Sequence, residues 1–360
     1  MHLQKIKAGI HTIELYAANL KYCETQKVVD HLTDQKAIQL RNSDPYNIDR
    51  RMKSSYLIDQ GINMRIHQSH KKSNGISFAV NPSTLLSSEY QPLKLFKPTK
   101  SNVRELLEQF KEVLDEVQLS HHGKLVVTPE ELSLSRMDLT VDLYFSKDVN
   151  LASLIRIFRK SKCPRYYKRH ELKGEKKHYF SIKTKKACFK VYDKIYELKK
   201  FDRCPPERQD QKILRLEITL KREKFLKCFN LKRDDDLYTM LNAGYKQIRY
   251  VLYQYLGKMF PACGTHWTYE KAVRKIKWSD LEQTAKEQML FLVEKTSRGA
   301  GLDTAARKWE EAYRVVKKKE FDKMMRMFDK IDVNPITLGA KEGEIPCLRK
   351  MLEAVKFPGT

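Results

Sequence analysis

The stretch RMDLTVDLYF, residues 136–145, alternates apolar and polar side chains along its whole length. Neighbouring side chains of a β-strand point to opposite faces of the sheet. The stretch therefore predicts a strand with one buried face, which is formed by Met137, Leu139, Val141, Leu143 and Phe145. The other face is polar and carries Arg136, Asp138, Thr140, Asp142 and Tyr144.

Similar alternation recurs on both sides of this stretch. ILRLEITL, residues 213–220, places Arg215 and Glu217 opposite a row of apolar residues. Further strands are predicted at residues 10–16, 62–67, 76–80 and 178–183, and the second and third of these form a hairpin. A helical period intervenes at residues 102–117 and again after Asp148. This pattern predicts an α+β fold, in which an antiparallel sheet has helices on one face and an open face on the other.

Beyond Glu223 the apolar residues follow a helical period as far as residue 331. A chain of 360 residues is long enough for two domains. We predict an α+β domain over residues 1–230 and a helical domain over residues 231–360. Trp267, Trp278 and Trp309 fall at helical positions and are expected in the core.

The chain is strongly basic, with 70 Lys and Arg against 45 Asp and Glu and a net charge of +25. Residues 156–200 alone contain 17 basic and 4 acidic side chains. A local excess of this size is typical of proteins that bind nucleic acid. We therefore expect DNA or RNA as the main partner.

The seven cysteines are scattered and include no CxxC pair, which argues against a zinc site or a disulfide framework. The first residues lack the apolar core of a signal peptide, and no apolar run reaches the length of a membrane span. These features predict a cytoplasmic protein with reduced thiols and no membrane partner.

The stretch KACFKVYDKIYELKK, residues 186–200, lies within the basic region. If it is a strand, Tyr192 lies between Lys190 and Lys194 on one face. Two lysines would favour the phenolate of Tyr192 and attract phosphate, as a nucleophile for phosphoryl transfer requires. Tyr196 is a rival nucleophile four residues further on, and the two tyrosines would come closer if the strand ends near Lys194 and a helix begins there. The alternative is an ordinary tyrosine on a solvated edge strand.

Three carboxylates, Asp138, Asp142 and Glu217, are expected on the same polar face as Tyr192. Hard oxygen ligands suit Mg²⁺ or Mn²⁺, and such an ion would polarise a phosphoryl oxygen. The alternative is that these carboxylates form cross-strand ion pairs with Arg136 and Arg215. The spacing of the residues allows both interpretations.

Three short motifs occur in a fixed order: SRMDLTVD at residues 135–142, FKVYDKIYELKK at 189–200 and LRLEITLKREKF at 214–225. Together they resemble the gene II/X replication proteins of filamentous phages and the related replication initiation factors of rolling-circle plasmids. The resemblance covers about residues 60–230. It rests on a Ser-Arg-x-Asp motif, a Tyr-x-Lys motif and an Arg-x-Glu motif.

The resemblance implies an enzyme that nicks one DNA strand at an origin and later rejoins it. The tyrosine would retain the 5′ phosphate as a phosphotyrosine and release a 3′ hydroxyl as a primer. By this likeness Tyr192 is the nucleophile, Lys194 contacts phosphate, and Asp138 and Glu217 hold the metal. Asp142 joins the metal ligands because of its place on the strand. Host helicase and replication proteins are further expected partners in a bacterial cytoplasm.

The sequence departs from many rolling-circle nickases because it has no His-hydrophobic-His motif. His67 or His178 is a candidate to complete a carboxylate site, although each is also an ordinary polar-face residue. DNA contacts are expected from Arg136, Lys190 and Arg215. They are also expected from the basic loop formed by Arg165, Tyr166, Tyr167, Lys168 and Arg169, whose tyrosines either stack on unpaired bases or pack within the protein.

Two alternatives to a replication initiator remain open at this point. One is a nucleic-acid-binding protein without catalysis, which would use an open sheet face. The other is a single-tyrosine relaxase or transposase. A tyrosine recombinase is disfavoured because its Arg, His-x-x-Arg and late Tyr arrangement is not found.

Overall fold

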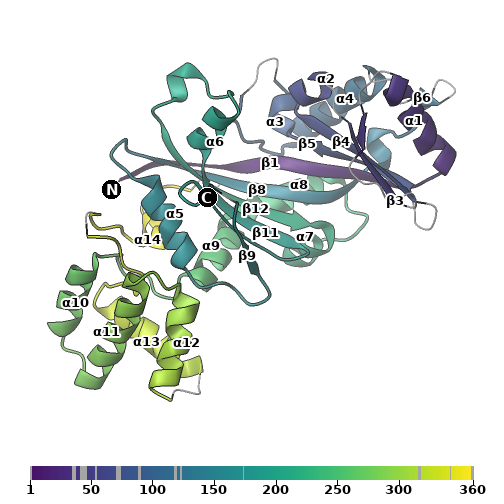
Figure 1. Cartoon of the computed structure of the whole chain (residues 1–360). Helices are drawn as coiled ribbons and strands as arrows, with labels where there is room; N and C mark the ends of the chain where they lie inside the picture. Colours follow the sequence, from purple (N-terminus) through teal and green to yellow (C-terminus); the bar gives the residue numbers. More distant parts are fainter. Residues whose placement is uncertain are drawn as a thin grey trace. The chain divides into compact units, whose positions relative to one another are not determined.

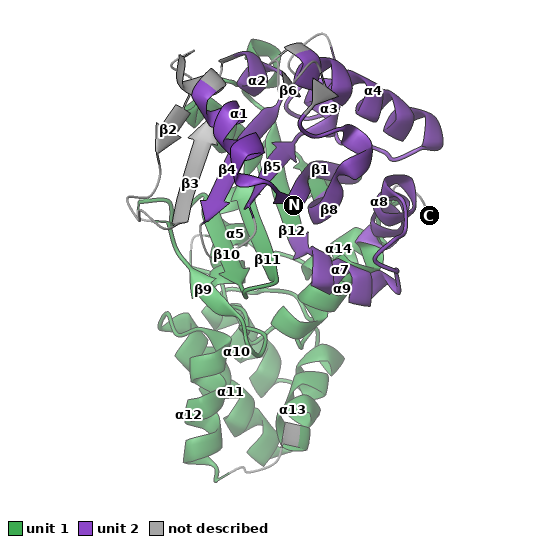
Figure 2. Cartoon of the chain, turned by 90° about the vertical axis from the view of Figure 1, so that its right-hand side faces the viewer, with its two compact units in different colours: residues 1–8, 141–218, 249–360 green, residues 9–140, 219–248 purple. Residues whose placement is uncertain are grey.

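The computed structural model describes residues 2–34, 38–40, 47–52, 55–69, 74–87, 91–116, 120–121, 124–172, 174–314, 318–340 and 342–357. The chain forms two compact units, which Figure 2 colours separately. Unit 1 contains residues 1–8, 141–218 and 249–360, and unit 2 contains residues 9–140 and 219–248. Three strands, β1 (Leu3–Leu20), β8 (Ser133–Phe145) and β12 (Lys212–Lys221), contribute residues to both units.

The sheet of unit 1 has the strand order β1-β8-β12-β11-β10-β9. Its outer strands are β11 (Ala187–Asp193), β10 (Tyr179–Lys183) and β9 (Lys168–His170), and they pair antiparallel. The register places Tyr179 opposite Tyr192 and Ser181 opposite Lys190. The predicted α+β class with an antiparallel sheet is confirmed.

Two helices cover the apolar face of these strands, α5 (Leu151–Lys160) and α9 (Ile248–Met259). The ring of Phe158 from α5 lies 6.0 Å from the rings of Phe180 and Phe189, between centroids. Phe189 also stacks on Tyr255 of α9, with centroids 5.1 Å apart. Aromatic contacts of this kind add to the free energy gained by burying apolar area. They fix which face of β11 points to the core.

The stretch 186–200 is a strand followed by a helix, which is one of the two arrangements that its sequence left open. β11 ends at Asp193, and helix α6 (Lys194–Lys200) follows at once. Asp193 is the helix N-cap, and its Oδ1 accepts a hydrogen bond of 3.0 Å from the backbone N–H of Tyr196. The helix sequence KIYELKK consists mainly of good helix formers, so the cap decides where the strand stops. In Figure 1, α6 lies above the strands and α9 lies below them.

The C-terminal part of unit 1 is helical, as predicted. It contains α10 (Tyr269–Lys277), α11 (Gln283–Ser297), α12 (Leu302–Ala312), α13 (Lys318–Lys330) and α14 (Leu348–Glu353). Figure 1 shows α10 to α13 gathered together. Trp309 is buried in this group and packs against Phe321, as expected for a core residue. The prediction is wrong for Trp278, which is 85% exposed.

Unit 2 has the strand order β2-β3-β4-β5-β1-β8, in which β2 is Ile38–Leu40 and β3 is Asn47–Met52. The predicted hairpin is confirmed as β4 (Ile62–Ser69) and β5 (Asn74–Val80), with Ile66 opposite Ile76. Residues 70–73 of its turn lie outside the described residues. A separate pair consists of β6 (Ser120–His121) and β7 (Lys124–Leu125).

The helices of unit 2 include α4 (Lys100–Glu116), which was predicted at 102–117. Its Phe110 packs edge to face on Phe78 of β5, with centroids 5.2 Å apart. The others are α1 (Tyr22–Asp34), α2 (Ser55–Asp59), α3 (Pro82–Leu85), α7 (Arg222–Phe229) and α8 (Leu237–Lys246). Short 3₁₀ helices lie at Pro129–Glu131 in unit 2 and at Pro206–Arg208 in unit 1.

The boundary predicted at residue 230 does not coincide with the limits of either unit. Helices α7 and α8 belong to unit 2, whereas the helices that follow α8 fall in unit 1. The chain passes from one unit to the other within β1, β8 and β12 and at the start of α9, rather than through a linker. Within the described part of the chain, no helix is long and apolar enough to span a membrane.

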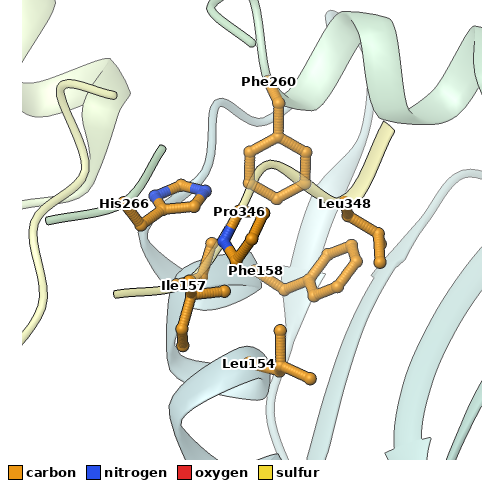
Figure 3. Close-up of a pocket in the computed structure, with 8 residues that line it drawn as sticks. Leu154, Ile157, Phe158, Phe260, His266, Pro346 and Leu348 are labelled. Carbon is orange, nitrogen blue, oxygen red and sulfur yellow. The ribbon is translucent and has the colours of Figure 1, made fainter. Parts of the chain in front are cut away.

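A buried histidine lies in an apolar part of unit 1. His266 is 2% exposed, and its Nδ1 donates a hydrogen bond of 2.8 Å to the carbonyl oxygen of Ile336. Figure 3 shows it in a small pocket lined by Leu154, Ile157, Phe158, Phe260, Ile345, Pro346 and Leu348. Burial in these surroundings lowers the pKa of His266 from 6.5 to about 4.

We expect this histidine to make the folded state less stable below neutral pH. The unfolded chain protonates His266 near pH 6.5, whereas the folded chain holds it neutral down to about pH 4. The unfolded state therefore binds more protons, and the free energy of unfolding should fall by about 2 kcal/mol from this residue alone between pH 7 and pH 5. Urea denaturation at both pH values measures the effect. His266→Asn should show a smaller difference between the two, and an equal difference would contradict the assignment.

Candidate active site

A fully buried ion pair lies at the centre of the polar side of the unit 1 sheet. Arg215 donates from Nε to Asp142 Oδ1 at 2.6 Å and from Nη2 to Oδ2 at 2.7 Å, and both side chains are 0% exposed. Burial alone would lower the pKa of Arg215, but the attraction of Asp142 outweighs it and raises the pKa. Asp142 therefore forms the cross-strand ion pair with Arg215 that the sequence allowed as the alternative to metal binding. Among the described residues, Nη1 of Arg215 has no hydrogen-bond partner.

Tyr192 and Glu217, which are buried, and the partly exposed Lys190 form a second group on the neighbouring strands β11 and β12. The phenol of Tyr192 donates a hydrogen bond to Glu217 Oε2 at 3.2 Å. Lys190 binds the other carboxylate oxygen, Oε1. Tyr192 is 7% exposed and Glu217 is 4% exposed. The sequence placed these three residues on one face, and the structure brings them into contact.

The phenol of Tyr192 is not activated by the lysines in the way the sequence suggested. Burial raises its pKa well above 10, and the negative charge of Glu217 raises it further. Lys190 cannot offset this because its charge is taken up by Glu217. Tyr192 is therefore a neutral hydrogen-bond donor to a carboxylate.

Lys194 does not face outward beside Tyr192, as it would in a continued strand. It is the first residue of α6, it is 5% exposed, and its Nζ lies 2.5 Å from Glu197 Oε2. Burial lowers the pKa of Lys194. The sequence reasoning missed Glu197, because its spacing of three residues from Lys194 has meaning only on a helix.

Tyr196 lies in the first turn of α6 and is more exposed than Tyr192. Its ring stacks on that of His178, with centroids 3.5 Å apart and planes at 5°. It also forms a side-chain hydrogen bond with Glu175. His178 Nδ1 lies 3.9 Å from Asp193 Oδ2. Each of the two candidate tyrosines thus has a glutamate partner of its own.

Asp138 lies in unit 2, where it is 4% exposed. Arg136 Nε lies 3.4 Å from its Oδ1, and Arg136 Nη1 lies 3.1 Å from Glu14 Oε2. The ion pair with Arg136 was the alternative to metal binding for this aspartate. His67, also in unit 2, contacts Ser77 Oγ at 3.5 Å.

Each of the predicted metal ligands has a basic partner in the structure. Asp142 is bound by Arg215, Glu217 by Lys190, and Asp138 by Arg136. Asp138 and Asp142 are four residues apart on β8, and the rise of a strand separates them by about 13 Å. No group of three or more His, Cys, Asp or Glu side chains could hold a metal within the described part of the chain. Mg²⁺ or Mn²⁺ stays a prediction.

The polar side of the sheet is also less open than the sequence suggested. Among the residues placed there, Asp138, Asp142, Tyr192, Arg215 and Glu217 are buried, whereas the side chains of Lys190 and Arg136 are 30% and 28% exposed. In unit 1, α6 provides the cover. The negative charge of its Glu197 raises the pKa of both Tyr192 and Arg215, although burial is the larger influence on each.

The basic loop before β10 divides into exposed and packed residues. Tyr166 is 79% exposed in a left-handed backbone conformation (φ 71°), with the guanidinium of Arg165 4.8 Å from its ring centre. Tyr167 is packed, and its hydroxyl is 2.7 Å from that of Tyr255. Lys168 is exposed on β9, and Arg169 pairs with Asp303 at 3.2 Å. Of the two tyrosines in this loop, Tyr166 is the one available to stack on a base.

Comparisons with known protein families and with curated proteins gave no match. No model of a known protein family matches the chain, and no curated protein matches it. The resemblance to replication initiators therefore rests on the three quoted motifs.

Proposed function

We propose that the chain nicks and rejoins single-stranded DNA through a covalent bond to Tyr192, as an initiator of rolling-circle replication. The observation that carries the proposal is the hydrogen bond from the Tyr192 phenol to Glu217, with Lys190 on the second carboxylate oxygen. A nucleophile within hydrogen-bond reach of a base, which is itself held by a third group, is the usual arrangement for nucleophilic catalysis. The basic character of residues 156–200 supports DNA as the substrate.

In the proposed reaction Glu217 is a general base rather than a metal ligand. Because its pKa is raised, the phenol of Tyr192 is neutral until it reacts. As its oxygen attacks phosphorus, the phenolic proton passes to Glu217, and the bond from phosphorus to the 3′ oxygen breaks. The 3′ oxygen takes a proton from solvent, and the 5′ phosphate stays on Tyr192. The reverse sequence rejoins the strand without a nucleotide.

DNA must reach a phenol that α6 covers. The proposal therefore includes a displacement of α6, which would also expose Lys194 to the bound phosphate. Arg215 Nη1, which lacks a hydrogen-bond partner within the described residues, is a further donor for a phosphate oxygen. Mg²⁺ or Mn²⁺, if bound, would supply polarisation of the phosphoryl group. Origin DNA, host helicase and replication proteins, and a bacterial cytoplasm belong to the same proposal.

The experiment that tests the proposal is a search for the covalent adduct. The full chain is incubated with labelled single-stranded oligonucleotides and Mg²⁺ or Mn²⁺, and a denaturing gel is run. Trypsin cuts after Lys190, Lys194 and Lys199, so Tyr192 falls on the peptide VYDK and Tyr196 on IYELK. We expect the nucleotide mass on VYDK. A nucleotide mass on IYELK instead would overturn the assignment of Tyr192 as the nucleophile. If a chelator leaves the reaction unchanged, the reaction does not require Mg²⁺ or Mn²⁺.

A second candidate is a nucleic-acid-binding protein without catalysis. The observation that favours it is the burial and mutual pairing of Asp142 with Arg215 and of Tyr192 with Glu217. Buried polar pairs of this kind also occur as purely structural parts of a protein core. In that case the same incubation gives no adduct on any peptide, while binding to DNA remains strong and weakens with salt.

A further inference from the structure

One face of helix α10 in unit 1 carries three cations and an exposed indole. Lys271, Arg274, Lys275 and Trp278 are all exposed, and Trp278 directly follows the last helical residue. Their spacing of three, four and seven residues places them on one side of a helix. Ala272 and Ile276, which are buried, hold the opposite side against the protein.

The cations on this face are not neutralised by acidic side chains in the described part of the chain. Within the described residues, none of the three has an acidic partner within ion-pair distance. The residues 269–278 carry four basic side chains and one acidic one. The amines of Lys271 and Lys275 lie 5.5 Å and 4.8 Å from the ring centre of Trp267, which orders them on the helix surface.

Trp278 is the most exposed large hydrophobic side chain in the part of the chain that the structure describes, at 85%. Its backbone is fixed, because its N–H donates to the carbonyl oxygen of Arg274 at 3.0 Å. A single exposed apolar residue needs no explanation by itself. An indole held at the end of a row of cations that have no acidic partner among the described residues presents a flat apolar surface beside concentrated positive charge.

We propose that this face of α10 binds single-stranded nucleic acid, with a base stacked on Trp278 and the phosphates on Lys271, Arg274 and Lys275. Unpaired bases expose their flat faces, whereas bases in a duplex stack on one another, so the indole selects single strands. An acidic peptide would satisfy the cations but would leave the indole in water. None of these residues belongs to the group around Tyr192, so the inference stands whether or not Tyr192 cuts DNA.

The test measures the affinity of the full chain for a labelled oligothymidylate by fluorescence anisotropy. Stacking of one base is worth about 1–3 kcal/mol, so Trp278→Ala should weaken binding by about 5- to 150-fold. Trp278→Phe, which keeps an aromatic face, should retain most of the affinity. Joint replacement of Lys271, Arg274 and Lys275 by alanine should reduce the slope of log K against log salt by about 2.

Lys277→Ala is the matched control, because it removes the same charge from the same helix outside this face. It should change the affinity less than Lys275→Ala does. Binding that is unchanged in Trp278→Ala would overturn the proposal, as would an equal loss for duplex DNA. Displacement of the oligonucleotide by polyglutamate at equal charge concentration would indicate an acidic protein partner instead. Because Trp278 is exposed, urea denaturation should confirm that the variant folds as the parent does.

Discussion

Replacing Asp142 by alanine should lower the free energy of unfolding by about 3–5 kcal/mol, the usual cost of breaking a buried ion pair from one side. Arg215 would keep its charge in a fully buried position, without the two short hydrogen bonds that now compensate its loss of water. Urea denaturation followed by circular dichroism measures the change. A loss below about 1 kcal/mol would show that the pair is not buried in solution, since exposed pairs fall in that range.

Two further variants show that the effect comes from the unpaired charge. Asp210→Ala breaks the ion pair with Lys147, whose side chains are 83% and 81% exposed, and should cause no measurable change. The double variant Asp142→Leu with Arg215→Met removes both charges and replaces them with apolar groups. It should recover most of the stability lost in the single variant, because neither partner is then left charged without the other.

The sequence predicted the two faces of the strands but not the cover over one of them. Alternation in residues 136–145 and 213–220 is enough to put Asp142, Arg215 and Glu217 on a common polar face. Whether that face meets water depends on what packs over it. The element concerned is α6, and the alternation of residues 186–194 left open whether the strand continues or a helix begins near Lys194. The signal for its start was Asp193, a good N-cap residue followed by helix formers.

The chemistry of Tyr192 could not be predicted for the same reason. Two lysines beside a tyrosine would favour the phenolate only if they were near it and otherwise unpaired. Lys190 instead binds Glu217, and Lys194 binds Glu197. These partners come from β12 and α6, so the contacts depend on the packing of elements and not on the spacing along one strand. The pKa of Tyr192 is raised as a result of burial and of Glu217.

The exposure of Trp278, in contrast, could have been predicted from the sequence. A tryptophan at a helical position is usually buried, and that expectation was applied to all three. For Trp309 it is confirmed, because Ala305 and Ala306, within four residues of it, are buried too. The residues three, four and seven positions before Trp278 are Lys275, Arg274 and Lys271, which share its side of the helix. Cations on every neighbouring position indicate an exposed face.

Replacing Glu217 by glutamine should slow formation of the tyrosyl–DNA adduct by about 100- to 10,000-fold, the usual contribution of a general base. Glutamine preserves the shape of the side chain and can still accept a hydrogen bond from Tyr192, but it cannot take up the phenolic proton. Because the pKa of that phenol is raised, the reaction depends on the base. A quenched-flow time course with a saturating oligonucleotide measures the rate of adduct formation. Tyr192→Phe has no phenolic oxygen and is the negative control, in which no adduct should form.

Glu175→Gln is the matched control, since Glu175 is hydrogen-bonded to Tyr196 as Glu217 is to Tyr192. It should leave the rate within a small factor of the parent chain. The opposite outcome, a large loss in Glu175→Gln and none in Glu217→Gln, would move the chemistry to Tyr196 and α6. Neither variant should weaken DNA binding, because neither removes a positive charge. A loss in Glu217→Gln that appears in binding instead of rate would assign Glu217 to holding Lys190 and β11 in place.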